Sequence, residues 1–180
     1  METTSHRVKD MIYISFFAII IGICAWISIP AVIPFTLQTF GVFLTISVLG
    51  GKRGTLAIIV YLLLGMIGIP VYATGLAGIG ILFGKTGGYM ISWIFIGLIM
   101  WAMERIFGKK TWVQIVSMFF GLLLCYTFGT LWYYYLYASE LGQVGIWTIL
   151  GWCVIPFIIP DLIKIALAIF VQKRLVRFID

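Results

Sequence analysis

Asp161 and Lys164, an acid and a base, stand three residues apart in this sequence. Residues three apart lie on the same face of a helix, so the carboxylate and the ammonium group would meet. The pair falls in an apolar stretch, residues 160–178, where a charge facing lipid would cost a few kcal/mol. Both groups must therefore face a polar interior or water. An internal salt bridge would meet this need, but we favour a site for a polar ligand.

Motifs for catalysis are missing from the sequence. The single histidine, His6, lies in the N-terminal tail, which excludes a metalloprotease helix. Asp161 is the only acid that lies neither at a cytoplasmic end nor in an outer loop, which excludes a paired-aspartate protease. Residues 84–87 look like a phosphate loop, but Ile79 stands where that motif requires its first glycine. We expect no enzyme, no metal and no cofactor. The cysteines have no metal-ligand spacing and are expected to be packing residues: Cys24, Cys125 and Cys153.

The composition indicates an all-α integral membrane protein. Hydrophobic residues form 63% of the 180 residues and charged residues 10%, whereas soluble domains have about 45–50% and about 25%. There is too little polar surface to cover a water-soluble globule. A helix needs about 20 apolar residues to cross a membrane. We expect a single domain, 1–180, with six transmembrane helices at about 11–29, 37–49, 55–69, 89–107, 111–137 and 160–178.

The segments between these spans differ in character. Pro30 and Pro34 predict a short uncharged loop after the first span. Residues 72–88 are too rich in glycine for a helix that faces lipid, and residues 139–159 predict a loop with a short helix or re-entrant piece. Pro160 suits the first turn of the last span, where no backbone donor is needed.

The basic residues predict the orientation in the membrane. Lys85 stands alone on the opposite side, and Lys164 lies inside the last span. The positive-inside rule makes the basic side cytoplasmic, with both termini on it. Basic residues at membrane ends also argue against nucleic-acid binding. The remaining ten of the 12 basic residues fall on one side of a six-span chain: Arg7, Lys9, Lys52, Arg53, Arg105, Lys109, Lys110, Lys173, Arg174 and Arg177.

Aromatic and small residues add further candidates. Tyr89 and Trp93, four apart at the start of a span, share one face, so they could stack on a flat ligand or lie in an interfacial aromatic belt. Ala18, Gly22 and Ala25 form a stripe on the first span. Small residues at this spacing let helices approach closely, which fits docking of a partner helix or packing within the same bundle.

Four segments in series carry a family resemblance: residues 33–39 (IPFTLQT), 62–71 (LLLGMIGIPV), 84–89 (GKTGGY) and 156–164 (PFIIPDLIK). Together with the turn GKRG at 51–54, they resemble the BioY family, the biotin-specific substrate-binding (S) components of energy-coupling-factor (ECF) vitamin importers. The resemblance covers nearly the whole chain. Two departures are Pro160, where many members have glycine, and Lys85, where many have proline.

The resemblance implies a six-helix protein in the cell membrane of a prokaryote, surrounded by lipid, that captures biotin from outside. It implies as partners a transmembrane coupling protein (EcfT) and two cytoplasmic ATPase subunits, with ATP used by those subunits only. It also implies that Asp161 and Lys164 belong to the ligand site. An S component for another vitamin, a solitary secondary transporter and a membrane enzyme are the alternatives.

The chemistry of biotin suits these residues. Its ureido ring has two N–H donors and one carbonyl acceptor, and its tail ends in a carboxylate. Asp161 could accept ureido N–H bonds, while Lys164 could donate to the ureido carbonyl or meet the tail carboxylate. Gln38, just below the first outer loop, could complete the set because an amide both donates and accepts.

Overall fold

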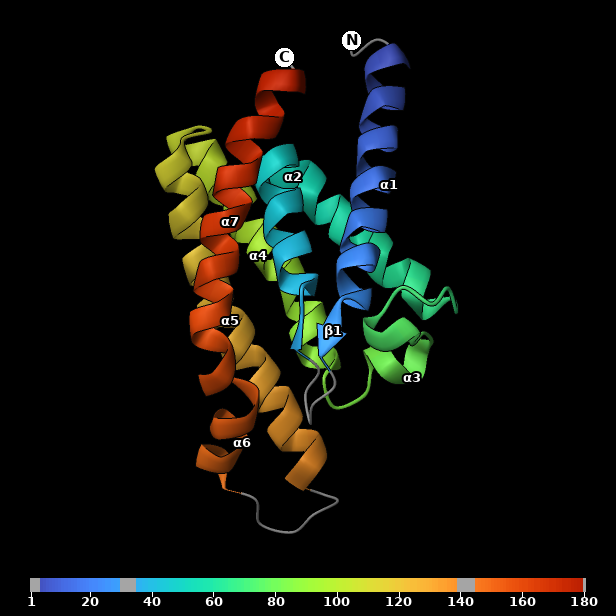
Figure 1. The fold of residues 1–180 in the computed structure, drawn as a ribbon, viewed down its shortest axis with the longest axis vertical. Coiled ribbons are helices and arrows are strands. Elements are labelled where there is room, and N and C mark those ends of the chain that lie inside the picture. The colour runs from blue at the N-terminus through green and yellow to red at the C-terminus, as the bar shows by residue number, and fades with distance from the viewer. Residues whose placement is uncertain (1–3, 30–34, 139–144, 180) are drawn as a thin grey trace.

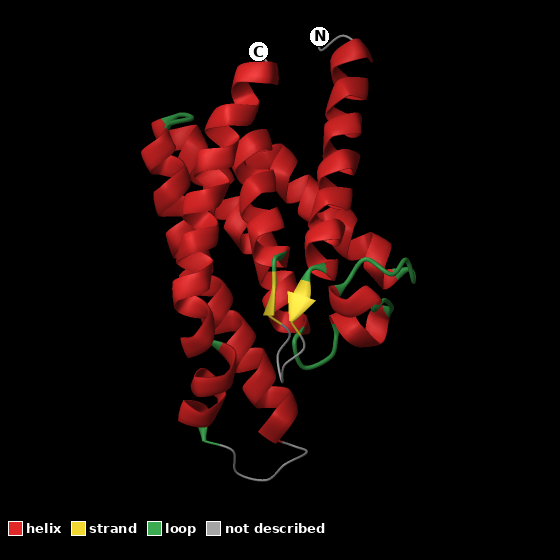
Figure 2. Ribbon diagram, viewed as in Figure 1, coloured by secondary structure: helices red, strands yellow, loops and turns green. Residues whose placement is uncertain are grey.

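Helices form most of the chain (Figure 1). The computed structural model describes residues 4–29, 35–138 and 145–179. Figure 2 shows a small pair of strands at one end of the helices. The long helices are α1 (Thr4–Trp26), α2 (Gln38–Met66), α4 (Gly87–Phe107), α5 (Thr111–Ala138) and α7 (Ile155–Ile179). The short elements are β1 (Ser28–Ile29), β2 (Phe35–Thr36), the 3₁₀ helix η1 (Ala73–Gly75), α3 (Ile79–Leu82) and α6 (Ile146–Cys153).

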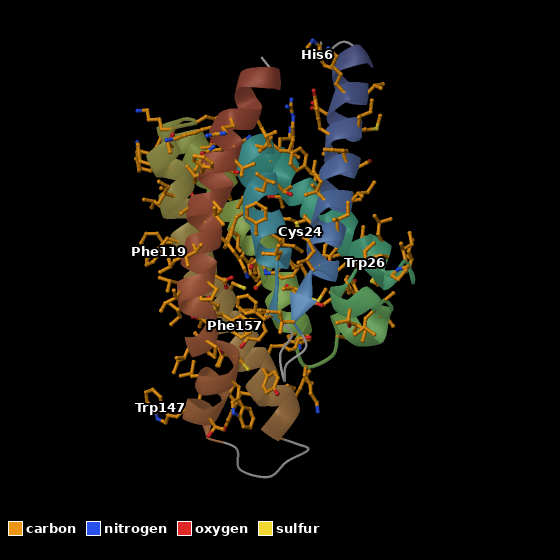
Figure 3. The ribbon with its side chains drawn as sticks, in the orientation of Figure 1. His6, Cys24, Trp26, Phe119, Trp147 and Phe157 are labelled. Atoms are coloured by element: carbon orange, nitrogen blue, oxygen red, sulfur yellow. The ribbon has the colours of Figure 1, made fainter. Side chains whose placement is uncertain are left out.

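Five helical stretches are long and apolar enough to cross a membrane, which agrees with the all-α membrane fold expected from composition. Their outer faces carry large apolar side chains. Phe119 and Trp147, for example, are exposed and point away from the bundle (Figure 3). The five stretches are His6–Trp26, Gln38–Met66, Gly87–Phe107, Thr111–Leu136 and Ile146–Leu175.

Helix α2 occupies the region of two expected spans, 37–49 and 55–69, which meet at a sharp bend. The bend is at Gly50, where φ is 78° and ψ is 170°, a conformation that glycine adopts without steric penalty. The chain reverses direction there (Figure 1). Glu104 of α4 stabilises the bend, because its Oε2 accepts a 2.7 Å hydrogen bond from the N–H of Gly51. One residue thus makes the reversal that we expected between the spans 37–49 and 55–69.

The last long helix begins earlier than expected. Helix α7 starts at Ile155, so Pro160 lies inside it and not in its first turn. Proline has no backbone N–H, so the carbonyl of Pro156 lacks the usual partner four residues later. Before α7, helix α6 supplies a short helix of the kind expected within residues 139–159.

The two ends of the bundle differ in charge. Both described chain ends, the bend of α2 and the α4–α5 turn lie at the same end (Figure 1). The bend carries Lys52 and Arg53, and the turn carries Lys109 and Lys110. By the positive-inside rule this end is cytoplasmic. The strand pair, η1, α3 and α6 lie toward the opposite, outer end; Pro30 and Pro34 fall outside the described residues.

The stripe of small residues on α1 packs inside the bundle. Ala18, Gly22 and Ala25 are all buried. A Cβ placed on Gly22 would lie 3.3 Å from Cβ of Val71, so the loop after α2 occupies this face. Within the described residues their small size therefore serves close packing in the bundle, and docking of a partner helix at this stripe stays a prediction.

Candidate ligand-binding site

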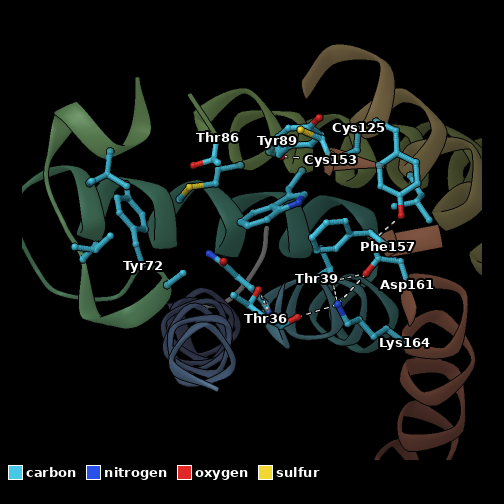
Figure 4. A pocket seen from close by; sticks show the side chains of 18 residues that line it. Thr36, Thr39, Tyr72, Thr86, Tyr89, Cys125, Cys153, Phe157, Asp161 and Lys164 are labelled. Carbon is cyan, nitrogen blue, oxygen red and sulfur yellow. Dashed lines mark hydrogen bonds and ion pairs between the residues drawn. The ribbon is translucent and has the colours of Figure 1, made fainter. Parts of the chain in front are cut away.

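A cavity of about 150 Å³ lies between the outer halves of the helices. Figure 4 shows Asp161, Lys164 and Thr39 at one end of it and Tyr72 at the other. The structure brings together all five side chains that the sequence suggested. They line this one cavity: Gln38, Tyr89, Trp93, Asp161 and Lys164.

The acid and the base form a buried pair. Nζ of Lys164 lies 2.9 Å from Oδ1 of Asp161, and both side chains are almost inaccessible to solvent. Thr39, on the first turn of α2, joins the two: its hydroxyl donates to Oδ1 at 2.9 Å and accepts from Nζ at 2.8 Å. Tyr126 of α5 donates to Oδ2 at 2.8 Å. Three helices therefore hold one carboxylate in place.

Lys164 uses all the donors that an ammonium group has. Its three N–H groups go to Asp161, to the Thr39 hydroxyl and, at 2.8 Å, to the carbonyl of Thr36. The ring of Phe35 lies 4.8 Å from Nζ, which adds a cation–π contact. Lys164 therefore neutralises and fixes Asp161, and it can donate to a ligand only if it gives up one of these bonds.

The polar end of the cavity consequently offers acceptors more readily than donors. The charges of Asp161 and Lys164 cancel, so this end has no net charge to attract an anion. Oδ2 of Asp161 receives one hydrogen bond, from Tyr126, and a carboxylate oxygen has room for two. A ligand N–H group suits this position best.

Aromatic rings form much of the remaining wall. The hydroxyl of Tyr89 lies 3.0 Å from that of Thr130, which fixes the ring in α4. Gly129 of α5 lets this ring approach, since a Cβ there would lie 2.2 Å from it. Phe157 stacks on Phe35, with ring centroids 5.6 Å apart. Such flat apolar surfaces suit a ring-shaped ligand.

Several lining residues were not identified from the sequence. Thr36 and Thr39 lie within residues 33–39, which carry the family resemblance and contain the candidate Gln38. The sequence could therefore have indicated that these two threonines line the cavity. Tyr126 was a polar group in an apolar span, but its partner in α7 depends on tertiary packing. Cys125 and Cys153 are buried and unbridged, as expected of packing residues, and they also line the cavity.

Comparisons with known proteins agree on one family. The sequence model of the BioY family matches residues 1–180. Biotin transporter BioY2 of Lactococcus lactis is 35% identical, over 95% of this chain and 92% of its own length. Biotin transporter BioY of Thermotoga maritima is 36% identical, over 93% and 95%. A crystal structure of the S-component for biotin from an ECF-type ABC transporter superposes with a TM-score of 0.83 at 27% identity, covering 98% of this chain and 95% of the other.

Proposed function

This chain belongs to the BioY family, and we propose that it captures biotin from outside the cell as the S component of an ECF-type importer. It is a multi-pass protein of a prokaryotic cell membrane. The basic end of the bundle faces the cytoplasm, so the cavity lies in the half that faces outward.

The observation that carries the proposal is the buried carboxylate at the polar end of the cavity. Asp161 is held on three sides by Thr39, Tyr126 and Lys164, and its Oδ2 keeps capacity for one more hydrogen bond. A ureido N–H of biotin fits that place. A hydrogen bond to a charged group contributes about 1.5–3 kcal/mol. Because the carboxylate is already fixed, little ordering entropy opposes the bond.

The apolar part of biotin suits the rest of the cavity. Tyr89 and Trp93 supply aromatic walls, and burial of the thioether ring contributes about 25 cal/mol per Å² before entropy costs. Gln38 supplies an amide to the cavity wall. We assign Lys164 mainly to neutralising Asp161, because its donors are already in use.

The energy for uptake comes from other subunits. The sequence has no nucleotide-binding motif, so this chain does not hydrolyse ATP itself. We propose that it works with a transmembrane coupling protein of the EcfT type and with two cytoplasmic ATPase subunits, and that it needs no cofactor of its own.

Titration calorimetry tests the ligand and the site together. Biotin, riboflavin and thiamine are titrated into the purified chain in detergent. We expect saturable binding of biotin alone, and at least tenfold weaker binding by Asp161→Asn and Lys164→Ala. Asp10→Asn, at the cytoplasmic end, is the matched control and should bind as the parent does.

Two outcomes would contradict the proposal. A folded parent that binds riboflavin or thiamine in place of biotin would assign the cavity to another vitamin. If both site variants bound biotin as tightly as the parent, the ligand would lie elsewhere.

A further inference from the structure

A fully buried tyrosine lies behind the wall of the cavity. Tyr61 of α2 is 0% exposed and is not among the residues that line the cavity. Its hydroxyl accepts a hydrogen bond from Nε2 of Gln38 and donates one of 3.1 Å to the carbonyl of Val71. Its ring packs edge-on against Tyr72, with centroids 5.8 Å apart. Tyr61 thus connects a cavity residue to the loop after α2.

The direction of these bonds follows from the groups involved. A backbone carbonyl can only accept, so the single proton of the Tyr61 hydroxyl goes to Val71. The Tyr61 oxygen is then left to accept, and Gln38 must turn its NH₂ group toward it. An amide without such partners can rotate about the last bond of its side chain, which exchanges the positions of its nitrogen and oxygen. Here the chain from Gln38 to Val71 removes that freedom.

The carbonyl oxygen of Gln38 is therefore held away from Tyr61. Among the described residues no hydrogen bond to this oxygen is formed, and the Gln38 side chain lines the cavity. The ammonium donors of Lys164 are already engaged. Gln38 Oε1 and Asp161 Oδ2 are then two acceptors available to a ligand, which suits a molecule that brings N–H donors.

We propose that Tyr61 is a positioning residue, which holds Gln38 as a hydrogen-bond acceptor toward the ligand and so selects an N–H donor. The proposal rests on the proposed function and deepens it: Gln38 accepts from a ureido N–H of biotin. Tyr61 touches no ligand atom and acts through Gln38 alone. Without its hydroxyl, the amide of Gln38 is free to present either end.

A double-mutant cycle tests this coupling. Biotin affinity is measured by calorimetry for the parent, Tyr61→Phe, Gln38→Leu and the double variant. We expect Tyr61→Phe to weaken binding about three- to tenfold, which is what one neutral hydrogen bond is worth. In the Gln38→Leu background the same change should have no effect, because the residue that Tyr61 positions is gone.

A matched variant separates positioning from folding. Thr55→Val removes another buried hydroxyl of α2, which donates 2.6 Å to the carbonyl of Gly51 near the cytoplasmic end. It should lower the unfolding temperature and leave biotin affinity unchanged. An equal loss of affinity from Thr55→Val would make the Tyr61 effect a general consequence of a weakened helix, and would overturn the proposal.

A second measurement uses only the ligand and does not depend on Tyr61→Phe being stable. Biotin methylated on one or the other ureido nitrogen lacks one N–H donor. For biotin, the change Gln38→Leu should lower the affinity. For one of the two derivatives, the same change should lower the affinity less. The proposal would be overturned if Gln38→Leu lowered the affinity for biotin and for both derivatives by the same factor. It would also be overturned if the affinity losses of Tyr61→Phe and Gln38→Leu were additive in the double variant. If the parent binds no biotin at all, the proposed function fails instead.

Discussion

Two ion pairs of this chain have the same length and lie in different surroundings. Arg53 and Asp10 meet at 2.9 Å near the cytoplasmic end, with side chains 46% and 32% exposed. Lys164 and Asp161 also meet at 2.9 Å, with side chains 6% and 3% exposed. The first pair ties the bend of α2 to α1. The second lies in the wall of the cavity.

The difference shows that distance alone says little about what an ion pair does. Water and salt screen the exposed pair, and such pairs contribute about 0–1 kcal/mol. The buried pair cannot rely on water, so Thr36, Thr39 and Tyr126 supply the hydrogen bonds that solvent would otherwise give. Losing one member of the buried pair therefore leaves the other as a buried charge without a counter-ion.

The largest expected effect comes from breaking the buried pair. Lys164→Met leaves the Asp161 carboxylate without its cation, which should lower the free energy of unfolding by about 3–5 kcal/mol. Chemical unfolding in detergent measures this loss. A loss below about 1 kcal/mol would mean that Asp161 is already neutral or solvated, and the two ion pairs would not differ as described.

The double variant Asp161→Asn/Lys164→Met is the control for this prediction. It removes both charges, so most of the lost stability should return. Biotin binding should stay weak, because the charged acceptor is gone. Recovery of stability without recovery of binding separates the structural role of the pair from its role toward the ligand.

A smaller loss is expected from Tyr126→Phe. This change removes the O–H donor to Oδ2 of Asp161 and keeps the ring. A hydrogen bond to a charged group is worth about 1.5–3 kcal/mol, so unfolding should be easier by that amount. Biotin affinity, measured by calorimetry, should fall less than in Asp161→Asn. An unchanged unfolding midpoint would show that water can replace Tyr126.

At the cytoplasmic end, the backbone should matter more than the ion pair. Gly50→Ala places a Cβ at a φ of 78°, and 3.1 Å from Oε2 of Glu104. The left-handed conformation costs a non-glycine residue about 1–2 kcal/mol. The unfolding midpoint should fall accordingly while biotin affinity stays the same. A neutral result would mean that the bend relaxes around the new side chain.

The smallest effect is expected from Arg53→Ala. The exposed pair with Asp10 should contribute less than about 1 kcal/mol, and less still in high salt. Unfolding curves at low and high ionic strength check both points. A loss comparable to that of Lys164→Met would abolish the contrast between the two pairs.

The sequence predicted five residues that line the cavity, but not the hydrogen bonds that join them to other helices. Asp161 and Lys164 were recognisable because they are the acid and base of one apolar span and stand three apart. Gln38, Tyr89 and Trp93 also line the cavity.

Tyr61 gave no comparable signal, since a tyrosine in an apolar helix can face lipid, core or ligand. The sequence is equally uninformative about Ala18, Gly22 and Ala25, because small residues permit close packing but do not indicate which helix packs against them.

The membrane class and the cytoplasmic end could be predicted from the sequence, because hydropathy and charge can be summed residue by residue along the chain. The likeness to BioY proteins could be predicted because short motifs carry it. Which side chains meet depends on the tertiary structure. Thr39 and Asp161 are 122 residues apart in sequence and share a hydrogen bond. Neither the hydrogen bond from the bend of α2 to Glu104 nor the inward face of Ala18 follows from local pattern. Each depends on neighbouring helices, whose packing is fixed by the whole bundle.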